Sequence, residues 1–267
     1  MRTAARFIFI SLFASLVLKI CAAGEPGLSE ESKSVIQSPT KIAEEAYAAY
    51  AQSDWKKAVQ DYRSLYDRGI ADPALLYNLG TAYARAGEKG RAILMLLKAE
   101  RLAPRDRDIQ DNLKRLAPEV SSQIAIFPVP PLQAFYNLFA LNEWAWIAAL
   151  ATTLSAMIWS IFFLIPRDKR GRWFVRRCAI TVLIVAALAH VFAGVKYYYE
   201  AYMSRGVVIT ADVRPHEAPD DSSPTSEFVL PQGTVIKISD AGVGGWVKAT
   251  YSGRNEVFIH RDQMEFL

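Results

Sequence analysis

The chain is organised around WAWIAALATTLSAMIWSIFFLI (Trp144–Ile165), 22 residues without a charge. A second uncharged stretch follows, CAITVLIVAALAHVFAGV (Cys178–Val195), which is 18 residues long. A helix needs about 20 mostly apolar residues to cross the hydrocarbon core of a membrane. The alternative is a pair of buried helices in a soluble protein, but soluble cores rarely carry uncharged runs of this length back to back. We therefore expect a transmembrane hairpin with helices at 143–165 and 178–196.

The segment that joins these stretches, PRDKRGRWFVRR at residues 166–177, is basic. It holds six Lys or Arg residues and one acid, Asp168, whereas no Lys or Arg occurs between Leu116 and Pro166. Short loops rich in Lys and Arg stay in the cytoplasm. The pattern predicts that loop 166–177 is cytoplasmic and that both ends of the hairpin face outward.

The N-terminus has the pattern of a secretory signal peptide at 1–23. A basic start precedes the apolar run Phe7–Leu18, and small residues end the segment. An uncleaved anchor and a lipoprotein cut before Cys21 are alternatives, and all three would export the residues after the signal. The polar segment 24–39 is expected to be a flexible lead-in.

Composition excludes several classes of function. The formal charge of +4 is concentrated in the basic loop, so the sequence does not predict a basic surface for binding nucleic acid. The two cysteines, Cys21 and Cys178, form no disulfide framework, and the three histidines are scattered. Neither metal-ligand spacing nor a nucleophile beside a base or a phosphate-binding glycine loop is present. We expect no cofactor, no metal and no enzymatic activity.

Residues 40–118 show an internal period of 34, which separates Ala58 from Ala92 and Tyr62 from Leu96. We expect two helix pairs, in which Leu102 contributes to the core of the second, followed by a capping helix at Arg105–Leu116. The second unit starts at Pro73 and resembles the tetratricopeptide repeat. The resemblance rests on Leu76, Leu79-Gly80, Tyr83, Gly87, Ala92, Leu96, Ala99 and Pro104.

Repeats of this kind bind peptides in the groove lined by the first helix of each pair. Tyr and Arg are enriched at binding hot spots, and both types occur at the positions that face this groove. The alternative is that these residues only solvate a concave surface. The expected protein-binding groove consists of Tyr47, Tyr50, Tyr77, Asn78, Thr81, Arg85, Asp111, Asn112 and Arg115.

Residues 119–142 form a proline-rich linker containing PVPPLQAFYNLFAL. The prolines at 128, 130 and 131 favour an extended chain, and the apolar part at 132–141 is expected to lie at the membrane surface. Asn142 is the expected N-cap of the first spanning helix.

The last segment, 206–267, carries short β-rich runs separated by turn residues, which predicts a small barrel. It resembles a bacterial SH3-like domain through Val208, Val213-Arg214, Phe228, Leu230, Gly233-Thr234, Val235 and Gly245-Trp246-Val247. A structural cap is the alternative to a binding module. The expected strands are 207–210, 228–230, 234–238, 246–249 and 256–259.

The expected fold is therefore multidomain: an all-α tetratricopeptide repeat domain, a two-helix transmembrane hairpin and a small all-β SH3-like barrel. This order of parts resembles the BatE-like proteins of bacterial aerotolerance (Bat) operons. The resemblance implies a scaffold in the bacterial inner (cytoplasmic) membrane with both domains outside the cytoplasm. Its implied partners are Bat-type von Willebrand A membrane proteins and, indirectly, a MoxR-type ATPase. The alternative is an envelope protein that binds peptidoglycan through the SH3-like domain.

Overall fold

The computed structural model describes residues 38–116, 130–164, 171–202, 204–240, 244–251 and 256–267. The expected signal peptide, almost all of the lead-in and the first part of the basic loop lie outside the described residues. The chain divides into two compact units, Met1–Lys41 and Ile42–Leu267. The second unit holds nearly all of the described helices and every described strand.

The segment expected to contain repeats forms consecutive helices joined by short turns. Asp54 and Asp72 cap two of these helices, because their carboxylates accept hydrogen bonds from the backbone N–H of Lys57 (3.1 Å) and Leu75 (3.0 Å). Five consecutive helices lie here, as the prediction of two helix pairs and a final single helix requires. The helices are α3 (Pro39–Ala51), α4 (Trp55–Asp67), α5 (Pro73–Arg85), α6 (Lys89–Leu102) and α7 (Arg107–Leu116).

Helices α5 and α6 pack closely because Gly80 lies between them. A methyl group on Gly80 would lie 2.9 Å from Cγ of Leu96 and 3.2 Å from the carbonyl oxygen of Ala92, so no larger residue fits. Tyr83 is buried in the same core. Leu102 is not: it is 48% exposed, since it is the last residue of α6 and the buried positions of that helix end at Ala99.

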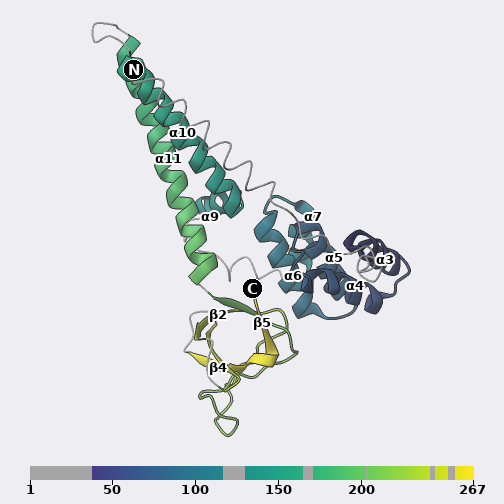
Figure 1. Ribbon diagram of the computed structural model, residues 1–267. Coiled ribbons are helices and arrows are strands. Elements are labelled where there is room, and N and C mark those ends of the chain that lie inside the picture. The colour runs from purple at the N-terminus through teal and green to yellow at the C-terminus, as the bar shows by residue number, and fades with distance from the viewer. Residues whose placement is uncertain (1–37, 117–129, 165–170, 203, 241–243, 252–255) are drawn as a thin grey trace, which may run out of the picture. The chain divides into compact units, whose positions relative to one another are not determined.

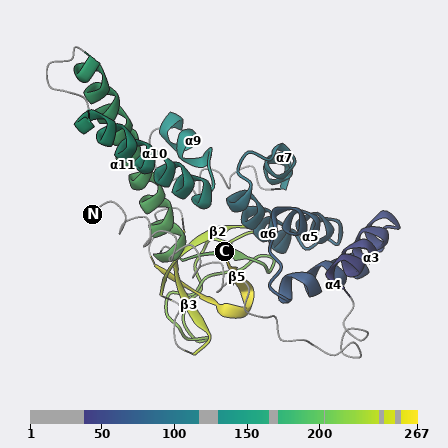
Figure 2. The same cartoon turned by 45° about the horizontal axis from the view of Figure 1, so that its top comes forward.

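Two long apolar helices, α10 (Leu141–Leu164) and α11 (Gly171–Tyr202), lie side by side (Figures 1 and 2). At 1.5 Å per residue they are about 36 Å and about 48 Å long, enough to cross a hydrocarbon core of about 30 Å. Small buried residues, among them Ala148 and Ala189, allow the helices to approach, while large apolar side chains point outward. Both helices are therefore long and apolar enough to span a membrane.

Helix α11 begins seven residues earlier than predicted, so Gly171–Arg177 of the expected loop is helical. This segment contains no helix-breaking residue after Gly171, and Arg is a good helix former. The guanidinium of Arg172 lies over the ring of Phe162 (4.4 Å), and that of Arg177 lies over Trp173 (3.7 Å). These contacts let long basic side chains stay on an otherwise apolar helix.

The described part of the linker is helical rather than extended. Helix α9 (Pro130–Asn137) starts at two prolines, whose fixed φ suits the first turn of a helix. Asn142 is not the N-cap of α10, because that helix already begins at Leu141; instead the carboxylate of Glu143 accepts a hydrogen bond from the N–H of Ala140 (2.9 Å).

The C-terminal segment forms a five-stranded antiparallel sheet in the order β4-β3-β2-β1-β5. Residues 228–230 form no strand; Leu230 makes only an isolated bridge to Val213. The short C-terminal strand was missed by the sequence analysis. The strands are β1 (Arg205–Val208), β2 (Val235–Asp240), β3 (Trp246–Thr250), β4 (Val257–His260) and β5 (Met264–Phe266).

The sheet is open, so the expectation of a closed barrel is wrong. The free edge of β4 is occupied by His216 instead of β5: the N–H of His216 donates to the carbonyl of Phe258 (2.8 Å), and Phe258 donates back (2.9 Å). β5 is only three residues long and pairs with β1. Trp246 is buried, with 6% of its surface exposed.

Helix α6 also packs against the sheet. Val207 and Val235 belong to the same buried cluster as the helices α3–α7, and the side chain of Ile93 fills the space over Gly233. At the edge of this contact, Nε of Arg91 lies 3.2 Å from a carboxylate oxygen of Glu265. Val207 and Val235 therefore join the core of the helical array, while nine other buried residues, among them Val208 and Ile236, form a separate core of the sheet.

The close approach of α6 to β1 can be tested at Gly90. A methyl group there would lie 2.5 Å from the carbonyl oxygen of Val208 and 2.7 Å from Cα of Ile209, and neither backbone atom can move cheaply. We expect Gly90→Ala to destabilise the full-length protein by about 1–3 kcal/mol. The measurement is the thermal midpoint in detergent.

Gly194→Ala is the matched control, since Gly194 is also helical and has no other group within 4 Å of the added methyl. It should not lower the midpoint, because alanine favours a helix by roughly 0.5–1 kcal/mol over glycine. Equal midpoints for the Gly90→Ala variant and the wild type would show that α6 does not approach the sheet this closely.

Candidate protein-binding groove

A groove of about 500 Å³ on the helical array brings together seven of the nine residues expected to bind a partner. Helix α5 contributes a row at i, i+4 and i+8, formed by Tyr77, Thr81 and Arg85, as its spacing predicted. The other four come from α3 and α7: Tyr50, Asp111, Asn112 and Arg115.

Tyr77 and Asn112 are joined across the groove. The side-chain amide of Asn112 donates a hydrogen bond to the hydroxyl of Tyr77 (3.1 Å). Both side chains are half-buried. This hydroxyl accepts one bond and keeps its own proton, so it can still donate to a ligand carbonyl. The contact therefore orders two polar groups in a position to recognise a peptide backbone.

Trp55 supports one end of the groove, which the sequence analysis did not foresee. The ring of Tyr50 meets the ring of Trp55 edge to face with 5.0 Å between centroids, and the guanidinium of Arg85 lies 5.9 Å from the same ring. The signal in the sequence was a large aromatic residue directly after the helix cap Asp54. Because the indole contacts both side chains, it restricts the conformations of Arg85 and Tyr50 before any ligand binds.

The charges of the groove are balanced. The lining contains two arginines, Arg85 and Arg115, and two aspartates, Asp108 and Asp111. All four side chains are exposed. Asp111 lies 3.8 Å from Lys114, and an ion pair this exposed contributes at most about 1 kcal/mol. The groove therefore selects a ligand by the placement of its charges and not by net charge.

Two expected residues are not part of the groove. Tyr47 is 68% exposed on α3. Asn78 does not line the groove either; its backbone carbonyl accepts a hydrogen bond from the hydroxyl of Thr81 (2.9 Å). Of the two amides expected to face this groove, only that of Asn112 lines it, and a role for Asn78 in binding stays a prediction. Sequence analysis also missed four lining residues: Ala84, Leu96, Asp108 and Leu116.

The described part of the chain contains no group of three His, Cys, Asp or Glu side chains arranged to hold a metal ion. The chemistry that the groove offers is thus hydrogen bonding, aromatic contact and paired charges.

The contact between Tyr77 and Asn112 predicts a measurable coupling. Tyr77→Phe keeps the ring and removes the acceptor, so we expect a loss of about 0.5–1.5 kcal/mol in the free energy of unfolding. A double-mutant cycle with Asn112→Ala, followed by denaturant unfolding, should give a coupling energy of similar size. Strictly additive effects of the two substitutions would contradict the contact.

No protein-family model matches this sequence, and comparison with curated proteins gives no significant match. The function is therefore argued from the groove, the apolar helices and the sheet.

Proposed function

We propose that this protein is a membrane-anchored adaptor that binds a segment of a partner protein in the groove of α3–α7. The observation that carries the proposal is the convergence of seven predicted side chains, from α3, α5 and α7, on that one groove. They combine two tyrosines and two arginines with hydrogen-bonding Thr81 and Asn112. This is the composition of a protein-binding hot spot.

The size of the groove favours a short peptide segment as the ligand. About 500 Å³ lies within the range of ligand sites, and a few side chains fill it. With only two helix pairs and one further helix the contact is short, so we expect a micromolar dissociation constant, roughly −8 kcal/mol. Confinement of both partners to one membrane raises their local concentration and offsets the weak contact.

The membrane part of the proposal rests on α10 and α11. We assign them to the bacterial inner membrane, with the basic turn between them in the cytoplasm and the helical array and the sheet outside. Arg172, Arg176 and Arg177 cluster at the turn end of α11. Such clusters mark the cytoplasmic side of a spanning helix.

The order of elements supports a more specific assignment. The four helices α3–α6 fit two tetratricopeptide repeats, with α7 as the cap. In the second pair, the small residues Gly80 and Ala92 lie at the contact between α5 and α6. The antiparallel sheet fits an SH3-like domain in an open form. On the BatE-like resemblance, the partners are Bat-type von Willebrand A membrane proteins, and indirectly a MoxR-type ATPase.

Peptidoglycan binding by the sheet is the alternative function. A wall-binding surface would present exposed aromatic rings, but Trp246 is buried, with its ring 3.7 Å from that of His260 and 4.9 Å from that of His216. This arrangement favours a role for Trp246 in the sheet's own packing. The groove is therefore the better binding site.

The proposal predicts that groove residues control partner retention. Full-length Tyr77→Ala/Arg85→Ala should lose co-purifying partner protein by about tenfold or more, the effect of removing two hot-spot side chains. Tyr47→Ala/Arg214→Ala removes the same residue types from exposed positions outside the groove. The control should retain the partner, and loss of partner from neither variant would exclude the groove.

A second experiment tests the topology. In a background with both cysteines replaced, single cysteines at Gln52, Gly171 and Glu217 occupy positions in the array, at the basic turn and near the sheet. A membrane-impermeant maleimide added to intact spheroplasts should label positions 52 and 217 and leave position 171 unlabelled until the cells are lysed. Labelling of position 171 before lysis would overturn the orientation.

A further inference from the structure

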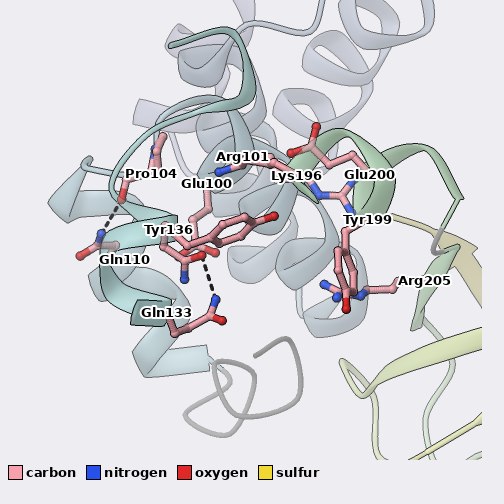
Figure 3. A pocket seen from close by; sticks show the side chains of 11 residues that line it. Glu100, Arg101, Pro104, Gln110, Gln133, Tyr136, Lys196, Tyr199, Glu200 and Arg205 are labelled. Carbon is pink, nitrogen blue, oxygen red and sulfur yellow. Dashed lines mark hydrogen bonds between the residues drawn. The ribbon is translucent and has the colours of Figure 1, made fainter. Parts of the chain in front are cut away.

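A second cavity, of about 170 Å³, lies where α6, α9, α11 and β1 meet. Gln110 and Tyr136 line one side of it, and Tyr199 and Arg205 line the other (Figure 3). At ~30 Å³ per water molecule the cavity has room for roughly five or six waters. It can therefore take a small polar group but not a folded segment of peptide.

The cavity contains more positive than negative side chains. Arg101, Lys196 and Arg205 face two carboxylates, Glu100 and Glu200. The ammonium of Lys196 donates to the carbonyl of Phe139 (2.6 Å) and is close enough to both carboxylates to interact with them electrostatically. Burial raises the pKa of Glu100, although Lys196 opposes this shift, so the positive excess is at least one charge.

The excess charge lies around Arg101 and Arg205. Burial lowers the pKa of both arginines; attraction by Glu200 opposes this shift at Arg101, whereas repulsion by Arg101 adds to it at Arg205. Neither guanidinium is within 4.0 Å of a carboxylate among the residues that the structure describes. Both guanidinium groups are partly removed from water, and only Arg101 is attracted by a carboxylate, Glu200, so the pair leaves a place for an anion with one charge.

The surroundings place this anion at a membrane surface. Lys196 and Tyr199 belong to the last turns of α11, at the end opposite its basic start. Next to the cavity, α9 and the residue after it expose Leu132, Phe135 and Leu138, although Phe135 also packs edge to face on Trp144. Tyrosines and exposed apolar side chains beside basic groups are typical of the interface between headgroups and acyl chains.

We propose that this cavity binds the phosphodiester headgroup of a membrane lipid, held by the guanidinium groups of Arg101 and Arg205. A phosphodiester carries one negative charge and matches the excess of the cavity. Arginine forms paired hydrogen bonds to phosphate oxygens, which suits a partly buried site. The exposed apolar side chains of α9 accommodate the acyl chains. This inference rests on the proposed insertion of α10 and α11 into a membrane.

The test uses full-length protein in a mild detergent and follows its thermal midpoint during titration. The probes are dihexanoyl phosphatidylglycerol, a diacylglycerol with the same chains but no phosphate, and sodium phosphate. Phosphatidylglycerol alone should raise the midpoint. In Arg101→Gln/Arg205→Gln the titration should shift to concentrations about tenfold higher or more, because charge-assisted hydrogen bonds are lost.

Arg107→Gln/Arg214→Gln is the matched control, since both arginines are exposed and lie outside the cavity. It should titrate like the wild type. Arg101→Lys/Arg205→Lys keeps both charges and should shift the titration to intermediate lipid concentrations. If the glutamine variant does not fold, this lysine variant replaces it in the test.

Three results would overturn the site. An equal effect of sodium phosphate would indicate a site for free anions, an equal effect of the diacylglycerol would indicate only an apolar surface, and unchanged titration in both cavity variants would show that the arginines bind no lipid. Carbonate extraction of reconstituted liposomes separates this inference from the proposed function. Protein released by carbonate would contradict membrane insertion itself, whereas retained protein with unchanged titration would remove the lipid site alone.

Discussion

The structure depends on the close approach of α6 to the sheet. Every residue of α6 from Ala92 to Leu97 is buried, so this helix has an apolar surface on all sides. One side packs on α5 across Gly80, and another packs on β1 and over Gly233. Gly233 has a φ of +91°, which suits glycine, and a side chain there would collide with Ile93. Without this contact, the apolar surface that α6 shares with the sheet would be exposed to water.

The same helix also forms a wall of both candidate sites. Leu96 lies in the groove, and Glu100, one turn later, lies in the cavity. The cavity needs the contact with the sheet as well, because Arg205 is the first residue of β1 and Arg101 is near the end of α6. The candidate protein-binding groove and the proposed anion-binding cavity are therefore separated by about one helical turn of a buried helix.

The apolar hairpin obeys a different constraint. In a hydrocarbon environment the backbone groups must be bonded within the segment, which a helix achieves. Large side chains on α10 and α11 can then face outward, while alanines such as Ala148 and Ala189 face the partner helix. At the end of the hairpin away from the basic turn this pattern changes: the ring of Trp144 is buried against Phe139 (5.1 Å) and Phe192 (5.0 Å). Phe135 of α9 packs on the same two rings, Trp144 (5.5 Å) and Phe192 (5.6 Å), which holds α9 against the hairpin and so helps to build the cavity.

Sequence by itself determined the features that depend on local pattern. The period of 34 residues placed the helix pairs, the uncharged runs placed α10 and α11, and the i, i+4, i+8 spacing placed Tyr77, Thr81 and Arg85 in one row. Only the tertiary structure decided the rest. His216 on the free edge of β4 keeps the sheet open, and Gly90 brings α6 onto β1. Arg101 and Arg205 meet although they are far apart in the chain. Such contacts depend on which surfaces fit together at atomic distance, and periodicity along the sequence carries no information about that fit.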